Sequence, residues 1–265
     1  MKNSFPKIMS IINSTPDSFS DGGNYDINQL TDKALKEIED GADIIDIGGE
    51  STRPGALPIS IDEEINRTIP LIQNIRKYNK HIPISLDTTK YEVAFEAIKY
   101  NINIINDISG LTNDIRLGQL AQDYDLEYII MHKKGTPQYM QINPTYNNLL
   151  QEIYDFFSKQ INLANQLKIK KIYLDVGIGF GKTFEHNIEL LKNLDYFSKL
   201  GYPLLLGISR KSFIGKMLDI PEPKNRDVAT ALIHSLLLGK KIEIIRVHNA
   251  KIHSELRTIY EYLSN

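Results

Sequence analysis

The feature that most constrains the fold is a regular alternation of short apolar runs and segments with helical spacing of apolar residues. The runs are three to five residues long and rich in Ile, Leu and Val, as buried β-strands are. They occupy residues 8–12, 44–47, 82–86, 102–105, 128–131, 172–174, 204–206 and 244–247. The segments between them include 30–38, 65–75 and 149–167. Alternation of strands with helices predicts that the strands are parallel.

Eight strand–helix units favour a closed barrel over an open sheet. The chain has 265 residues, and a (β/α)8 TIM barrel typically has about 250. No Pro-, Ser- or Gly-rich linker interrupts the alternation. We therefore expect an α/β protein with a single (β/α)8 barrel domain over residues 1–265. An open doubly wound sheet is the structural alternative.

Composition narrows the class of partner. The chain carries 31 Lys and Arg against 33 Asp and Glu, so it has no overall charge that would favour nucleic acid or an anionic membrane. It has no cysteine, which excludes disulfides, thiolate nucleophiles and cysteine-based zinc sites. Neither a secretory signal pattern nor an apolar run of about 18 residues occurs. We expect a cytoplasmic protein that acts on small molecules.

Polar residues and glycines follow almost every predicted strand, and in a barrel such positions meet at one mouth. They include Asn13, segment 48–53, Asp87, Asn106, Asp107, Asp175, segment 209–212 and segment 246–248. Capping of the next helix is an equally good account of any one position. Capping does not explain why Arg53, Lys211, Arg246 and His248 gather at the same end.

Residue types divide this mouth into two predicted pockets. The cationic side chains predict an anion pocket suited to phosphate, because guanidinium groups make paired hydrogen bonds to it. Asp87, Asn106 and Asp175 predict a second pocket in which a carboxylate accepts two N–H groups from the amidine edge of a heterocycle, while an amide both donates and accepts.

A glycine-rich stretch and six histidines form two further patterns. The glycine-rich stretch VGIGFGKT ends like a nucleotide-binding P-loop, but Val176 stands where that motif requires glycine. We interpret it as a loop with close backbone approach after Asp175. Among the histidines, His248 shares a strand face with Arg246, whereas we expect a structural role for His132. We expect surface or helix-packing roles for His81, His186, His234 and His253.

Eight motifs, in order along nearly the whole chain, resemble those of the dihydropteroate synthase family. The two longest are NSTPDSFSDGG at residues 13–23 and GGESTRPGA at 48–56. SLDTTK, INDISG, MHKKGTP, LDVGIGFGKT, GISRKSFIG and RVHNAK follow at 85–90, 105–110, 131–137, 174–183, 207–215 and 246–251. The resemblance implies joining of p-aminobenzoate to the methylene carbon of (7,8-dihydropterin-6-yl)methyl diphosphate, which gives 7,8-dihydropteroate and diphosphate.

The resemblance also implies roles for individual residues. Asp87, Asn106, Asp175 and Lys211 would hold the pterin, and Asn13 would contact Mg²⁺ and diphosphate. The diphosphate would also meet Thr52, Arg53, Arg246 and His248, and p-aminobenzoate would lie near Phe180, Lys211 and Ser212. Met131 and Gly207, from two of the motifs, are further expected substrate contacts. Catalysis would depend on Asp87, Lys211, Arg246 and His248.

The implied mechanism is dissociative loss of diphosphate to leave a stabilised pterin-methylene cation, which requires no side-chain nucleophile. Mg²⁺, Arg246 and His248 would stabilise the departing anion, and Asp87 and Asp175 the cation. The loops 13–23 and 48–56 would close over the site and exclude water. The resemblance further implies a homodimer.

Three alternatives remain open at this stage. A pterin-binding methyltransferase domain would share the Asp and Asn pocket but would not need Arg53, Arg246 and His248. A catalytically silent pterin-binding subunit would have lost ligands, whereas every expected ligand is present. The third alternative is another phosphate-binding barrel enzyme, because the architecture alone supports no more specific function. Val176, Ile178, Lys133, Lys134, Ser14 and Asn249 depart from the family pattern.

Overall fold

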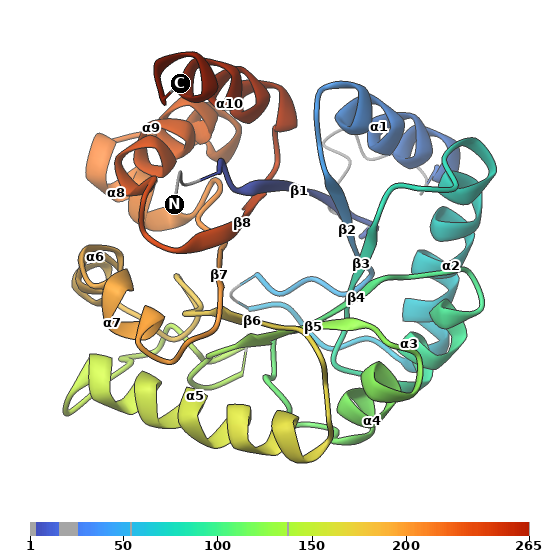
Figure 1. Ribbon diagram of the computed structural model, residues 1–265, viewed down its shortest axis with the longest axis horizontal. Helices are drawn as coiled ribbons and strands as arrows, with labels where there is room; N and C mark the ends of the chain where they lie inside the picture. Colours follow the sequence, from blue (N-terminus) through green and yellow to red (C-terminus); the bar gives the residue numbers. More distant parts are fainter. Residues whose placement is uncertain (1–3, 16–25, 54, 137, 265) are drawn as a thin grey trace.

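Eight parallel strands form a closed barrel in the computed structural model, which describes residues 4–15, 26–53, 55–136 and 138–264 (Figure 1). The strands are β1 (Lys7–Asn13), β2 (Ile44–Gly48), β3 (Ile84–Asp87), β4 (Ile104–Asp107), β5 (Glu127–Met131), β6 (Ile172–Asp175), β7 (Leu204–Leu206) and β8 (Ile242–Val247). β1 pairs with both β2 and β8, so the sheet has no free edge. The predicted TIM barrel is confirmed, and the open-sheet alternative is wrong.

Helices form a ring outside the strands (Figure 1). They are α1 (Ile27–Glu39), α2 (Ile61–Tyr78), α3 (Tyr91–Ile98), α4 (Arg116–Asp123), α5 (Leu149–Gln166), α6 (Phe184–Lys192), α7 (Leu194–Ser198), α8 (Ser212–Leu218), the 3₁₀ helix η2 (Pro223–Arg226), α9 (Asp227–Leu237) and α10 (Ala250–Ser264). Local caps define their starts: the Ser60 side chain accepts the Glu63 N–H of α2, and Thr183 does the same for His186 of α6.

The predicted strands all occur, with small differences at their ends. β3 begins at Ile84 and β4 at Ile104, each two residues later than the apolar pattern indicates. Pro83 lies at the entry to β3, and proline has no N–H to donate to a neighbouring strand. The prediction of one domain over residues 1–265 stays a prediction.

The core has two layers because side chains alternate across each strand. One layer lies between the strands and the helices and includes Ile8, Ile45 and Ile105. The other is a separate cluster inside the barrel, made of Met9, Ile44, Ile104, Ile129, Tyr173, Leu205 and Ile244. This inner layer fills the barrel below the mouth, so the mouth has a packed floor.

The histidines expected to have packing roles contact helices. His186 completes the capping box of α6 through its ring. His234 of α9 and His253 of α10 are buried against each other, with His234 Nδ1 2.9 Å from His253 Nε2. His253 Nδ1 also lies 2.8 Å from the Asn249 carbonyl, one turn earlier in the chain. His234 and His253 therefore join α9 to α10, and His186 stabilises the start of α6.

None of the helices within the described ranges combines the length and apolar character that crossing a membrane requires.

Candidate active site

The residues that form the mouth each follow a residue of the inner core layer by two positions in the sequence. Strand side chains alternate with a period of two, so residues i and i+2 share a face. On the inner face this places a second residue beyond each apolar one, and except for Met131 this second residue is polar or glycine. The pairs are Ile44 and Asp46, Ile104 and Asn106, Ile129 and Met131, Tyr173 and Asp175, Leu205 and Gly207, and Ile244 and Arg246. One alternating pattern thus supplies both the floor and the site.

An ion-paired group of acidic residues occupies one side of the mouth. Arg246 Nε donates to Asp46 Oδ2 at 2.6 Å, and Arg246 Nη2 donates to Asp87 Oδ2 at 2.8 Å. Asp46 is fully buried, and Asn106 Nδ2 lies 3.3 Å from each of its carboxylate oxygens. We call Asp46, Asp87, Asn106 and Asp175 the acidic half of the mouth.

The environment makes Asp87 a weaker acid than usual. Burial raises the pKa of Asp87 to about 7; the charge of Arg246 opposes this increase, and the neighbouring Asp46 adds to it. The carboxylates of Asp46 and Asp87 therefore share the Arg246 guanidinium in a poorly solvated environment. Additional N–H donors or a positive charge would favour ionised Asp87, which suits this side to a ligand rich in N–H groups.

Asp175 and Lys211 form the adjoining wall. Asp175 Oδ1 accepts the Gly177 N–H at 2.8 Å, and burial raises the pKa of Asp175 against the opposing charge of Lys211. Burial lowers the pKa of Lys211 to about 8, while Asp175 opposes the change. The Lys211 ammonium lies 4.5 Å from the centre of the Phe180 ring and bonds to the Ile178 carbonyl. A cation, a carboxylate and an aromatic face therefore adjoin one another.

Two loops are locked together beside this wall. Gly177 and Gly181 both have a φ of +66°, and an added Cβ would lie 1.9 Å from the His132 carbonyl oxygen or 2.1 Å from that of Lys134. Buried Lys182 Nζ lies 3.1 Å from both the Phe180 carbonyl and His132 Nδ1. Burial and the charge of Lys182 lower the pKa of His132 to about 2, so His132 is neutral and structural, as expected.

Positive charges also gather at the mouth, around His248. Burial lowers the pKa of His248 well below its usual range, and Arg210, Arg246, Lys33 and Arg53 lower it further. Lys33 on α1 is exposed, but desolvation by its surroundings lowers its pKa, as do Arg210 and Lys224, against the opposing effect of Glu37. We call Lys33, Arg53, Arg210 and His248 the basic half of the mouth. It can neutralise an anion that carries several charges.

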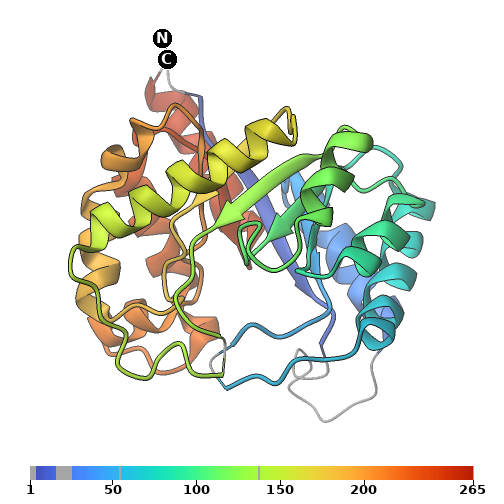
Figure 2. The ribbon, with the colours of Figure 1, turned by 90° about the horizontal axis from the view of Figure 1, so that it is seen from below.

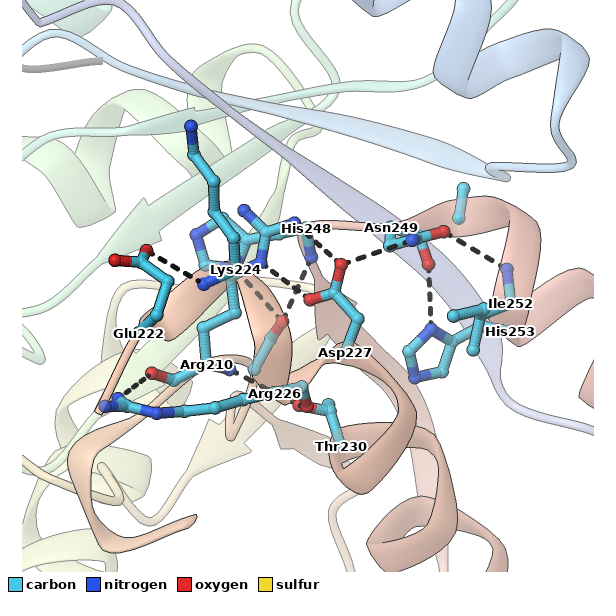
Figure 3. Close-up of polar contacts among 12 residues, drawn as sticks. Arg210, Glu222, Lys224, Arg226, Asp227, Thr230, His248, Asn249, Ile252 and His253 are labelled. Carbon is cyan, nitrogen blue, oxygen red and sulfur yellow. Dashed lines mark hydrogen bonds and ion pairs between the residues drawn. The ribbon is translucent and has the colours of Figure 1, made fainter. Parts of the chain in front are cut away.

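Hydrogen bonds to Asp227, the first residue of α9, link the loops that follow β7 and β8 and support the basic half (Figure 3). Arg210 Nε and Nη2 donate to the two Asp227 carboxylate oxygens at 2.6 and 2.7 Å. Asn249 Nδ2 donates to Asp227 Oδ2 at 3.2 Å. Asp227 therefore joins the residue after His248 to Arg210, and it fixes the direction of the Arg210 side chain.

Comparison with known proteins decides the family. The model of the family described as "Pterin binding enzyme" matches residues 9–248. The dihydropteroate synthase of a Synechocystis strain is 44% identical over 97% of this chain and 89% of its own length. The chain belongs to the dihydropteroate synthase family of pterin-binding enzymes.

Solved structures agree with this assignment. A Clostridium difficile dihydropteroate synthase crystallised in the presence of pteroic acid has a TM-score of 0.89 and 41% identity, over 99% of this chain and 97% of that one. A Xanthomonas albilineans dihydropteroate synthase with 4-aminobenzoic acid has a TM-score of 0.90 and 33% identity, over 98% of this chain and 93% of that one. This chain is accordingly a transferase of the dihydropteroate synthase kind.

The family's expected ligands lie in the mouth or on its rim. Asn13 ends β1, and buried Met131 ends β5 beside Asp175. A Cβ on Gly207 would lie 3.6 Å from Asp175 Oδ2, so glycine there keeps space over the carboxylate. Thr52 and Arg53 lie on the loop that follows β2, and Ser212 begins α8.

The two signature loops of the dihydropteroate synthase family are described to different extents. Lys90 Nζ forms ion pairs with Glu50 and with buried Glu64, which tie the 48–56 loop to α2 and to the start of α3. Figure 2 shows this loop and the loop before α5 at the same end of the barrel. Residues 16–23 of the first signature loop and Pro54 of the second lie outside the described residues. The predicted closure of these loops stays a prediction.

Arg246 differs in part from the sequence-based expectation for the family's anion pocket. Two of its nitrogens bond to Asp46 and Asp87, and among the described residues Nη1 has no bonding partner. Arg246 therefore lies at the boundary between the two halves. Sequence reasoning missed Asp46, although its position two residues after Ile44 on the inner face was the available signal. It also missed Lys33, which lies on α1, and it assigned no role to Arg210 within segment 209–212.

Proposed function

We propose that the acidic half binds the pterin ring of (7,8-dihydropterin-6-yl)methyl diphosphate and that the basic half binds its diphosphate. The boundary position of Arg246 carries this proposal, because one guanidinium contacts both buried carboxylates and retains a donor for a second ligand group. p-Aminobenzoate then attacks the methylene carbon between the halves, and the products are 7,8-dihydropteroate and diphosphate.

Pterin binding follows from the hydrogen-bonding capacity of the acidic half. The carboxylates of Asp87 and Asp175 accept N–H groups from the ring, and Asn106 both donates and accepts. Lys211 donates to a ring acceptor from above Asp175. The raised pKa of Asp87 falls when a ligand supplies N–H donors, so the ionised carboxylate is the form that binds.

Chemistry proceeds by separation of charge between the two halves. The methylene C–O bond breaks, and its electron pair leaves with diphosphate. Asp87 and Asp175 stabilise the pterin-methylene cation, while Arg53, Arg246 and His248 stabilise the anion. The aminobenzoate nitrogen forms the new C–N bond and loses a proton. Phe180 offers a face to the aminobenzoate ring, and Ser212 and Lys211 lie towards its carboxylate.

The residues present fit a magnesium ion that arrives with the diphosphate. Asn13 offers one neutral oxygen at the end of β1. Within the described ranges no three acidic or histidine side chains form a metal cluster. One protein oxygen suits Mg²⁺, which retains water and binds substrate phosphates. When bound, the ion would supply charge neutralisation at the leaving group.

A homodimer and a cytoplasmic location complete the proposal. α9 exposes an apolar stripe of Val228, Leu232 and Leu236, which are 62%, 60% and 82% exposed at a spacing of four residues. Its neighbour α10 exposes Ile259 and Leu263 (Figure 1). A second copy would cover this surface. The absence of cysteine suits a reducing cytoplasm.

One assay tests the activity. Purified protein is incubated with Mg²⁺, the pterin diphosphate and p-aminobenzoate, and dihydropteroate and diphosphate are measured. Both products should appear in equal amounts. Tight pterin binding without product would instead favour a silent pterin-binding subunit.

A charged substitution tests the dimer. Leu232→Asp places a carboxylate in the stripe and should convert a dimer to a monomer in sedimentation velocity, because the interface would bury an unpaired charge. Tyr78→Asp, at an exposed residue of α2, is the control and should leave the dimer intact. Identical sedimentation of wild type and Leu232→Asp would refute this interface.

A further inference from the structure

Ser209 and His248 form a close contact in the basic half of the mouth. Both the backbone N–H and the ring Nδ1 of His248 lie close to the Ser209 hydroxyl oxygen, at 3.1 and 3.0 Å. Ser209 is 7% exposed, and it lies in the loop that follows β7, opposite the end of β8. The Ser209 hydroxyl group therefore contacts two different nitrogen atoms of His248.

The hydrogen positions in this contact follow from elimination. The His248 backbone N–H carries a fixed hydrogen, so it donates and the Ser209 oxygen accepts. The hydroxyl hydrogen then needs an acceptor, and across the described part of the chain only His248 Nδ1 contacts this oxygen as a possible acceptor. If Nδ1 carried the hydrogen instead, the buried hydroxyl hydrogen would remain unbonded, which is unfavourable.

The charges around the ring exclude the doubly protonated form. Arg210, Arg246, Lys33 and Arg53 surround His248, and burial together with these charges keeps the imidazole neutral. A neutral ring carries a single hydrogen. With Nδ1 occupied as an acceptor, that hydrogen lies on Nε2, which has no bonding partner among the described residues.

We propose that Ser209 is a positioning residue that fixes the tautomer of His248, so that Nε2–H is presented as a donor to the diphosphate. The opposite tautomer would present a lone pair to the anion and would repel it. This inference rests on the proposed role of His248 in diphosphate binding. Ser209 itself need not touch substrate.

Nitrogen NMR of protein labelled with ¹⁵N in histidine tests the tautomer without any substrate. The wild-type His248 Nδ1 signal should be of the unprotonated type, and the Nε2 signal of the protonated type. In Ser209→Ala the Nδ1 signal should shift because it loses its donor, and Ser209→Thr, which keeps the hydroxyl, should restore it. A protonated-type Nδ1 in the wild-type protein overturns the proposal even if no variant folds.

Kinetics test the consequence for the substrate. Ser209→Ala should raise KM for the pterin diphosphate roughly five- to tenfold, the factor for one lost hydrogen bond, with little change in KM for p-aminobenzoate. Ser209→Thr should recover most of this loss. Ser85→Ala is the matched control, since this buried serine makes no hydrogen bond within the described chain. An unchanged KM in Ser209→Ala, or equal increases for both substrates, overturns the proposal.

Failure of the proposed function can be told apart from failure of this inference. If the wild-type protein forms no dihydropteroate, the function is wrong, but the NMR signals still report the tautomer. Titration calorimetry with inorganic diphosphate gives a second readout. Ser209→Ala should bind it several-fold more weakly than wild type, and equal affinities count against the inference.

Discussion

The acidic and basic halves of the mouth are built by different means. In the acidic half, Asp46, Asn106 and Asp175 stand on inner-face positions of the alternate strands β2, β4 and β6, each two residues beyond a residue of the packed floor. In the basic half, Lys33 comes from a helix, while Arg53 and Arg210 come from loops. The sheet therefore fixes the spacing of the acidic groups, whereas the basic groups depend on long side chains and on partners such as Asp227.

This difference suits the two parts of the substrate. A flat heterocycle needs donors and acceptors at fixed separations, which strand ends provide. A diphosphate changes its charge distribution as it leaves, and several long cationic side chains can follow it. Arg246 joins the halves because it stands on a strand, like the acidic residues, and carries the charge of the basic group.

The largest expected effect is at this boundary. Arg246→Ala leaves the carboxylates of Asp46 and Asp87 buried without their cation, so we expect a loss of roughly 3 kcal/mol in unfolding free energy by urea denaturation at pH 8. It should also weaken binding of an unphosphorylated pterin, and it should weaken binding of the pterin diphosphate more, because Nη1 is then lost to the diphosphate as well. The control is Lys36→Ala, at an exposed ion pair on α1, which should leave the urea midpoint almost unchanged. Selective loss of diphosphate binding alone would place Arg246 wholly in the basic half.

An intermediate effect concerns pH and the acidic half. The pKa of Asp87 is raised to about 7 without ligand, and N–H donors of the pterin lower it on binding. Pterin affinity should therefore fall roughly tenfold per pH unit below 7 and level off above it. Calorimetric titrations from pH 5.5 to 8.5 would measure this dependence, which should vanish in Asp87→Asn. The same dependence in that variant would assign the titration to another group.

The smallest effect concerns the basic half. Lys33→Ala removes one of several charges around His248, so the affinity for the pterin diphosphate should fall about three- to fivefold at low ionic strength, and less in high salt. Affinity for an unphosphorylated pterin should stay constant. Lys36→Ala, one turn along the same helix, is the matched control for charge. If both variants lowered the affinity equally, the loss would come from the overall charge of the protein, and Lys33 would have no specific role in the basic half.

The sequence predicted the barrel and the acidic half well, for a physical reason. Short apolar runs identify the strands and therefore the residues at their ends. Because the ends of parallel strands meet at one mouth, Asp87, Asn106 and Asp175 could be predicted to lie close together. Asp46 was within reach of the same rule. Lys33 was not, because its place depends on how a helix packs against the barrel. Segment 209–212 was placed at the mouth, but the role of Arg210 in it could not be predicted, because the pairing with Asp227 joins residues distant in sequence. The contacts of Arg246 with both Asp46 and Asp87 could not be predicted from the sequence for the same reason.

The close approach of the loops that follow β5 and β6 has a consequence for how the protein opens. With Gly177 against the His132 carbonyl and Gly181 against that of Lys134, neither loop can change its path unless the other does. They should behave as one cooperative unit in native-state hydrogen exchange, with amides of residues 132–136 and 177–182 sharing a single opening free energy. A substrate that orders the Phe180 wall would then slow exchange in both segments at once, including residues that it does not touch.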